Sequence, residues 1–138
     1  MTEATVQLVR DAMLPDPHAL EAGATAQEAG EALMRPEVRA VLVTDGGKLA
    51  GVITRKTLVR EVVAPGRDPR TTTLGEIAEP PNATIESGMP LGEAFAFLEE
   101  QDFERVPVVE DGKLVGVLSR SVVQRRLAED EPPDEPED

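Results

Sequence analysis

Apolar residues along the chain change from a helical spacing to short continuous runs. After Thr25 they recur every three or four positions as far as residue 33, and Thr25 with Glu28 forms the capping-box pattern that begins a helix. The apolar runs 40–44 and 49–54 flank an Asp-Gly-Gly turn, which predicts a β-hairpin. The apolar face of a second helix is then formed by Leu58, Val59, Val62 and Val63.

The second half of the chain has the same order of elements. Helical spacing over 91–98 is followed by apolar runs at 106–109 and 114–119, on either side of an Asp-Gly turn. The final helix has an apolar face formed by Val122, Val123 and Leu127. Short extended segments near 19–20 and 84–85 precede the first helix of each half. Each half is therefore predicted to fold as strand, helix, strand, strand, helix.

The two halves are copies of one unit. At an offset of 65 residues, 15 of the 55 positions from Val9 onward are identical, whereas chance would give about 3 or 4. We therefore predict an α+β fold of two repeats, 8–64 and 74–128, joined by a breaker-rich linker at 65–73. Because one repeat alone is marginal, the two are expected to pack with pseudo-twofold symmetry around a shared core. The expected core positions are Val41, Val43, Val52, Val106, Val108 and Val117.

Composition and charge narrow the function. The 138 residues include 27 acidic and 14 basic side chains, giving a net charge of −13, which disfavours nucleic acid and anionic membrane surfaces as partners. Cysteine is absent and histidine occurs once, so neither a disulfide nor a metal centre is expected. The acids do not accompany a nucleophile, so no catalytic residue is predicted and the chain is not expected to be an enzyme.

The two ends of the chain carry further expectations. The first ten residues do not have a basic flank before an apolar run, and the apolar runs are far shorter than a membrane span. These features predict that the protein is located in the cytoplasm. Residues 129–138 contain seven acids, three prolines and no base, and are expected to form a disordered acidic tail.

The hairpins carry a family resemblance. Residues 105–119, Arg-Val-Pro-Val-Val-Glu-Asp-Gly-Lys-Leu-Val-Gly-Val-Leu-Ser, resemble the signature of the cystathionine-beta-synthase-type (CBS) domain, and 41–54 is a looser copy. The resemblance covers residues 8–128 and implies a tandem CBS-domain pair. It further implies a regulatory module that binds AMP, ADP, ATP or another adenosyl ligand in clefts between the repeats. Such a module commonly forms a homodimer and transmits its ligand state to a partner protein.

The resemblance also assigns ligand-binding residues. The hydroxyl expected to touch phosphate at the end of each hairpin is Thr54 or Ser119, whereas Thr57 and Val122 replace the ribose-holding aspartate of the family. Thr57 retains a polar group, so the first site is the better candidate. The expected ligand-binding residues are His18, Ala19, Arg39, Ala40, Thr54, Arg55 and Thr57 in the first repeat, and Ala83, Thr84, Arg105, Ser119 and Arg120 in the second.

Most of these residues also fit ordinary structural roles. Thr54 and Ser119 suit helix caps, because their hydroxyls accept hydrogen bonds from free amides at a helix start. Arg55 and Arg120 suit solvated positions in a first helical turn, and His18 suits a surface or packing position.

A second class of function stays open at this point, namely a ligand-free dimerisation or protein-interaction module with degenerate nucleotide sites. The missing aspartates favour it, and Glu104 would repel a phosphate, so that Arg105 is expected to pair with an acid. The apolar positions that exceed one small core, and so favour a homodimer, are Leu58, Phe97, Phe103 and Leu127.

Overall fold

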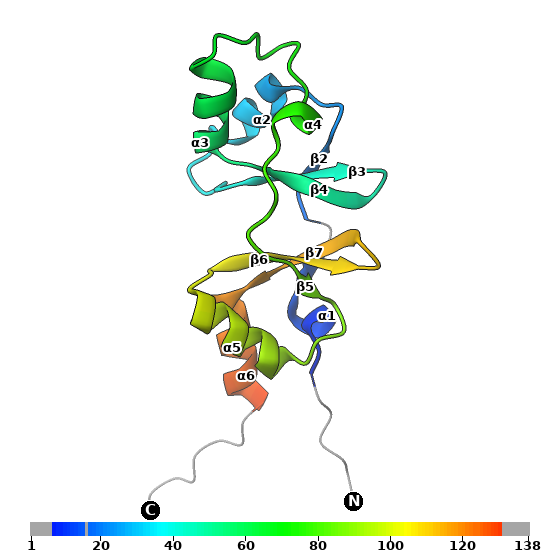
Figure 1. Ribbon diagram of the computed structural model, residues 1–138. Helices are drawn as coiled ribbons and strands as arrows, with labels where there is room; N and C mark the ends of the chain where they lie inside the picture. The colour runs from blue at the N-terminus through cyan, green and yellow to red at the C-terminus, as the bar shows by residue number, and fades with distance from the viewer. Residues whose placement is uncertain (1–6, 16, 131–138) are drawn as a thin grey trace, which may run out of the picture. The chain divides into compact units, whose positions relative to one another are not determined.

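The computed structural model describes residues 7–15 and 17–130, which divide into two compact units (Figure 1). The repeat-one unit contains residues 17–82 together with the turn residues 111–114. The repeat-two unit contains residues 7–15, 83–110 and 115–130. Each unit therefore includes a segment from outside its own repeat.

Three strands form the sheet of the repeat-one unit. Strand β2 (Ala19–Glu21) pairs in parallel with β3 (Val41–Asp45), and β3 pairs in antiparallel fashion with β4 (Lys48–Ile53). Gly46 and Gly47 turn the hairpin with φ angles of 61° and 87°. Glycine adopts such positive angles without steric cost, which explains the predicted turn.

The helices of this unit lie on one face of its sheet (Figure 1). Helix α2 (Ala26–Ala32) begins at the predicted capping box of Thr25. Helix α3 (Arg55–Leu58) continues as the π-helical turn η1 (Val59–Val63), and α4 (Leu74–Ile77) follows. The predicted apolar face of the second helix is only partly correct, because the wider π turn buries Val62 but leaves Val59 and Val63 exposed.

The repeat-two unit has the corresponding sheet. Strand β5 (Ile85–Glu86) pairs in parallel with β6 (Arg105–Glu110), which neighbours β7 (Lys113–Ser119) across the Asp-Gly turn. Strand β1 (Leu14–Pro15) pairs in antiparallel fashion with β7. The predicted strand, helix, strand, strand, helix order is therefore confirmed in both repeats, and each repeat begins with a further short helix that the pattern did not predict.

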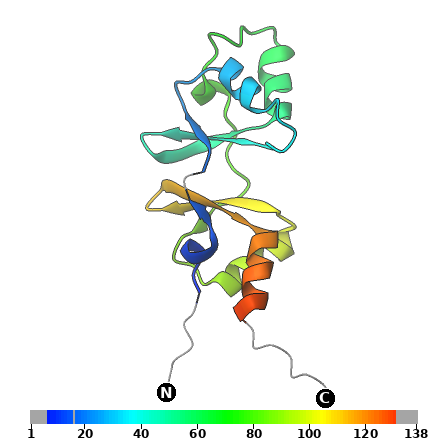
Figure 2. The ribbon, with the colours of Figure 1, turned by 180° about the vertical axis from the view of Figure 1, so that it is seen from behind.

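Helices α1 (Val9–Ala12), α5 (Leu91–Gln101) and α6 (Arg120–Asp130) lie on one face of this second sheet (Figure 2). Helix α6 extends into the predicted tail as far as Asp130, and the remainder of that tail, 131–138, lies outside the described residues. Of the helices in the described ranges, none is long and apolar enough to cross a membrane.

Each repeat begins with a short helix, α1 or α4, that packs into the unit of the other repeat. Val9 and Ala12 of α1 are buried in the core of the repeat-two unit. Leu74 and Ile77 of α4, at the same positions of the second repeat, are buried in the core of the repeat-one unit. The two repeats have thus exchanged their first helices.

The segment 65–73, predicted as a linker, is bound to the repeat-one unit. The main-chain N–H of Ala26 donates to the Thr72 carbonyl at 2.8 Å, and that of Gln27 donates to the Pro69 carbonyl at 2.9 Å. Since these N–H groups at the start of α2 lack partners within the helix, the linker satisfies them.

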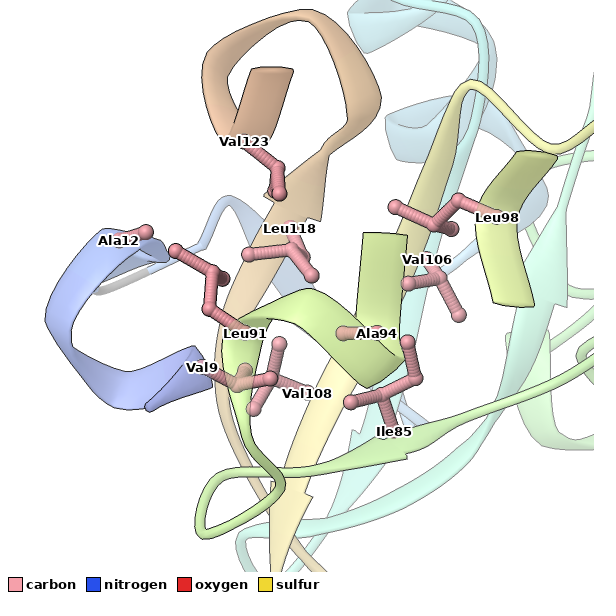
Figure 3. Close-up of a cluster of buried hydrophobic side chains, with 10 residues drawn as sticks. All are labelled: Val9, Ala12, Ile85, Leu91, Ala94, Leu98, Val106, Val108, Leu118 and Val123. Atoms are coloured by element: carbon pink, nitrogen blue, oxygen red, sulfur yellow. The ribbon is translucent and has the colours of Figure 1, made fainter. Parts of the chain in front are cut away.

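The hydrophobic residues form two cores, one in each unit, and not the single shared core predicted from the repeats. Val41 and Val43 belong to the repeat-one core, whereas Val106 and Val108 belong to the repeat-two core. The residues of the repeat-two core are Val9, Ala12, Ile85, Leu91, Ala94, Leu98, Val106, Val108, Leu118 and Val123 (Figure 3).

The prediction was also wrong in placing Val52 and Val117 in the core. Both are only partly buried, whereas the next residues, Ile53 and Leu118, are completely buried. Successive side chains of a strand point to opposite faces of the sheet, so only one residue of each pair can face the helices.

Candidate functional site

Thr54 ends the hairpin of the repeat-one unit and begins α3. Its hydroxyl oxygen accepts the main-chain N–H of Thr57 at 3.2 Å, and the Thr57 hydroxyl oxygen accepts the N–H of Thr54 at 3.0 Å. This reciprocal capping box confirms the structural role expected of Thr54. Thr57 is completely buried.

A carboxylate from a distant part of the chain completes this cluster. The Thr57 hydroxyl donates to Glu79 Oε2, and the Arg60 guanidinium donates to Glu79 Oε1 at 2.5 Å. The bond from Thr57, followed by that from Arg60, holds the pKa of Glu79 below its ordinary value, so the carboxyl group is ionised near neutral pH. The bond to Glu79 in turn raises the pKa of Arg60.

The main chain of Glu79 is held against β4. Its N–H donates to the Val52 carbonyl at 2.9 Å, and the Val52 N–H donates to the Glu79 carbonyl at 2.8 Å. Gly51 permits this approach, because a Cβ atom at position 51 would lie 2.8 Å from both the Ala78 Cβ and the Glu79 carbonyl oxygen. The main chain of Glu79 is therefore held by Val52, and its carboxylate is held by Thr57 and Arg60.

Two of the predicted ligand-binding residues lie in one pocket. His18 and Ala40 line a pocket of about 510 Å³ within the repeat-one unit. The other residues that line it are Glu31, Ala32, Arg35, Glu37 and Val38. Ala19 lies in β2 beside Leu42, while Arg39 is exposed and does not line this pocket.

Arg55 anchors the loop beside this pocket. Its guanidinium donates to the carbonyl oxygens of Leu33 at 2.5 Å and Arg35 at 2.8 Å, just beyond the end of α2. A cation there is stabilised by the free carbonyl groups of a helix C-terminus. A phosphate would have to compete with both carbonyls, so the structure favours an anchoring role for Arg55.

The corresponding positions of the repeat-two unit form a weaker cluster. The Ser119 hydroxyl lies 3.0 Å from that of Ser121 and accepts the Val122 N–H at 3.5 Å, the outer limit of a hydrogen bond. Val122 is apolar and offers no hydroxyl to a neighbour. Ala83 packs against the core, and Thr84 is exposed.

The acids close to Arg105 in the sequence form ion pairs with Arg120 instead. Arg120 pairs with Asp102 at 3.2 Å and with Glu104 at 3.7 Å. Arg105 is exposed and forms no ion pair within the described ranges. The expectation for Arg105 was wrong because the neighbouring acid, Glu104, pairs with Arg120 at the start of α6.

Sequence reasoning missed Glu79 and Arg60. A signal was nevertheless present in the alignment of the repeats, where Glu79 corresponds to Leu14 and Thr57 corresponds to Val122. Both positions are polar in one copy and apolar in the other. A paired difference of this kind makes two positions candidates for contact, and the structure shows the contact between Thr57 and Glu79.

The chain shares sequence with several known proteins. Hypoxic response protein 1 of Mycobacterium tuberculosis is 32% identical over 85 residues, which cover 62% of this chain and 59% of that protein. YhcV, a CBS domain-containing protein of Bacillus subtilis, is 27% identical over 114 residues, which cover 80% of this chain and 79% of that protein. The match thus spans only about three fifths of the mycobacterial relative.

Solved structures have the same fold. The crystal structure of hypoxic response protein I, which holds two coordinated zinc ions, matches with a TM-score of 0.72 at 25% identity and covers 87% of this chain and 98% of that one. In this chain, the described residues bring together no group of three or more His, Cys, Asp or Glu side chains that could hold a metal ion.

The structure of CBSX2 in complex with AMP matches with a TM-score of 0.69 at 26% identity, and covers 88% of this chain and 96% of that one. The family model for the CBS domain matches residues 9–64 and again residues 74–129. The chain therefore belongs to the CBS domain family and contains two CBS domains in tandem.

Proposed function

We propose that the chain is a regulatory module that binds an adenosine nucleotide or related adenosyl ligand at the hairpin end of the repeat-one unit. The observation that carries the proposal is the ionised Glu79, with Arg60 beside it, next to the hydroxyls of Thr54 and Thr57. The similarity to CBSX2, whose structure contains AMP, supports an adenosine nucleotide as the ligand.

The cluster and the pocket lie at one end of the same sheet. Val41 pairs with Ile53 across the hairpin, so Ala40 and Thr54 are the next residues across from each other. Ala40 and His18 line the pocket, and Thr54 belongs to the cluster. In the proposed arrangement the pocket receives the base of the ligand, and Glu79 and Arg60 provide polar contacts to its sugar and phosphate.

The module is proposed to act by binding and not by catalysis. A ligand that prefers one conformation shifts the population toward it, by as much as its affinity differs between the two states. A partner protein that recognises that conformation would then respond to the ligand concentration. The repeat-two unit is proposed to be a degenerate site, because Val122 and Leu14 stand where Thr57 and Glu79 stand in the repeat-one unit.

Titration calorimetry of the full chain with AMP, ADP, ATP and S-adenosylmethionine tests this function. We expect at least one of these ligands to bind with a stoichiometry of about one per chain, since Val122 and Leu14 in the repeat-two unit lack the polar groups of Thr57 and Glu79. At 100 times its dissociation constant such a ligand adds about 2.7 kcal/mol to the free energy of unfolding, measurable as a rise in Tm. The absence of binding for all four ligands would contradict the function, and two equal sites would contradict the degeneracy of the second repeat.

An exposed apolar surface favours a second candidate, a homodimeric interaction module. Met34, Val59 and Val63 are 80%, 57% and 69% exposed, and Met34 and Val63 line an apolar pocket of about 480 Å³ between α2 and η1. Exposed apolar side chains that line a common pocket, as Met34 and Val63 do, are typical of protein interfaces. Light scattering at micromolar concentration should give about twice the 14.8 kDa chain mass, and Val63→Glu should restore the monomer. A wild-type mass near that of one chain would contradict this second candidate.

A further inference from the structure

The hairpin-end cluster consists of Thr54, Thr57, Arg60 and Glu79, and Glu79 retains more acceptor capacity than either hydroxyl in it. An ionised carboxylate accepts through two oxygens with about four lone-pair positions. One bond from Thr57 occupies Oε2 and one from Arg60 occupies Oε1, so each oxygen retains a position for another donor. The Glu79 side chain is 39% exposed, which leaves the carboxylate accessible.

Thr57, the residue at the expected ligand position, has no such capacity. Its hydroxyl proton is donated to Glu79, so the 3.0 Å contact with the Thr54 hydroxyl must be donated by Thr54. The Thr57 oxygen also accepts the Thr54 N–H at 3.0 Å. One donor and two acceptor positions are all that a hydroxyl offers, and Thr57 is completely buried. Thr57 therefore positions Glu79 and does not contact a ligand.

Arg60 can leave Glu79 without losing every acidic partner. Its side chain is 50% exposed, and its Nε lies 3.4 Å from Glu61 Oε2 as well as donating through Nη2 to Glu79. A ligand donor can take the place of Arg60 at Oε1 while the ion pair with Glu61 remains. Both carboxylate oxygens of Glu79 can then face the same ligand.

We propose that Glu79 selects ligands that carry two neighbouring hydroxyl groups, such as the 2′- and 3′-hydroxyls of a ribonucleotide. The inference rests on the proposed nucleotide binding and names the chemical group that this site recognises. Two adjacent oxygens of a carboxylate match two adjacent hydroxyl donors, one bond to each. Glu79 is fixed before the ligand arrives, because its main chain is paired with Val52 and its side chain with Thr57.

Binding of AMP, 2′-deoxy-AMP and 3′-deoxy-AMP to the full chain tests the proposal. A hydrogen bond to a charged group is strong enough that each deoxy analogue should bind at least about tenfold more weakly than AMP. Glu79→Gln should weaken AMP binding by a similar factor and reduce the difference between AMP and its analogues. The control is Glu76→Gln, which removes the same charge from a carboxylate bound by Thr73 and Arg67 and should bind AMP as the wild type does.

The outcomes separate the two proposals. If wild-type protein binds AMP and both deoxy analogues equally, nucleotide binding stands and the role of Glu79 is overturned. If Glu79→Gln keeps the full preference for AMP, the selecting group lies elsewhere and the role of Glu79 is again overturned. If none of the three nucleotides binds, both proposals fail. The comparison of ligands on the wild type needs no variant, so a folding defect in Glu79→Gln cannot obscure the result.

Discussion

Leu14 and Glu79 occupy the same position of the two repeats, 65 residues apart, and make the same main-chain pairing. Leu14 pairs with Val117 in the repeat-two unit, and Glu79 pairs with Val52 in the repeat-one unit. The main-chain pairing is therefore the same in both repeats, whereas the side chain at this position is apolar in one and acidic in the other. An exposed leucine stands on one hairpin, and on the other stands a carboxylate bound to Thr57 and Arg60.

The hairpin glycines should be intolerant of a side chain. A Cβ atom at Gly51 would lie 2.8 Å from the Glu79 carbonyl oxygen, and one at Gly116 would lie 2.6 Å from Met13 Sδ and 2.8 Å from the Leu14 carbonyl oxygen. Because main-chain atoms cannot move aside cheaply, we expect Gly51→Ala and Gly116→Ala each to cost about 1–3 kcal/mol in urea unfolding.

The control for these two variants is Gly92→Ala in helix α5, where a Cβ atom would meet nothing within 4 Å. This substitution should stabilise the protein by up to about 1 kcal/mol, because alanine favours a helix more than glycine does. Equal effects at all three glycines would show that close packing is not what the hairpins require.

The helix caps formed by Thr54 and Ser119 should contribute differently to the free energy of unfolding. Thr54 and Thr57 bond reciprocally at 3.2 and 3.0 Å, whereas Ser119 accepts the Val122 N–H only at 3.5 Å. We expect Thr54→Ala to lower the free energy of unfolding by about 1–2 kcal/mol and Ser119→Ala by about 0.5 kcal/mol or less. Chemical denaturation of both variants measures this difference, and a larger loss for Ser119→Ala would contradict the assigned geometry.

Two valines of the repeat-two hairpin, Val108 and Val117, should respond differently to substitution by aspartate because they lie on opposite faces of the sheet. Val108 is completely buried, so Val108→Asp places an unpaired carboxylate in the repeat-two core. That costs several kcal/mol, a large part of the roughly 5–15 kcal/mol that stabilises a typical domain. We expect the cooperative unfolding transition to be lost. Val117→Asp, at a partly buried position on the other face, should retain it, as circular dichroism on heating would show.

Glu79 should contribute to the pH dependence of stability. Its pKa is lower in the folded protein, through the bond from Thr57 and then that from Arg60, so its contribution is complete above the unfolded carboxyl pKa of about 4.3. The contribution is lost as the pH falls through the lower folded pKa. The difference in unfolding free energy between wild type and Glu79→Gln should therefore be constant from pH 6 to 7 and shrink below pH 4.

If that difference instead grew on acidification, the folded pKa of Glu79 would have to be raised, and the bonds from Thr57 and Arg60 would not form in solution. Urea denaturation at each pH provides the measurement.

Local structure was predictable from sequence wherever the signal lies within a few residues. The capping box of Thr25 and Glu28 and the Gly46-Gly47 turn each specify their element by adjacent chemistry. The repeat comparison added the order of elements, since Val41 and Val106 occupy the same position of the repeated apolar run.

Partners distant in sequence were not predictable in the same way. Val9 and Ala12 mark one apolar helix face, but the pattern of that face does not say which core it enters. Glu79 lies 22 residues beyond Thr57, and only the fold brings its carboxylate to that hydroxyl. The prediction of a single core failed for a related reason. Each repeat completes its own core with the short helix that begins the other repeat, and the sequence pattern does not show this.

The exchange of first helices has a consequence for synthesis of the chain. Helix α1 leaves the ribosome before the rest of the described structure, yet Val9 and Ala12 pack with Leu118 and Val123, which are made more than 100 residues later. The repeat-one unit gains its own α4 early, once residues up to Glu79 have emerged. Because domains generally fold as they are synthesised, most of the repeat-one unit can fold before α1 is able to pack into the repeat-two core. The repeat-two unit is therefore completed by a helix that is made before all its other described elements.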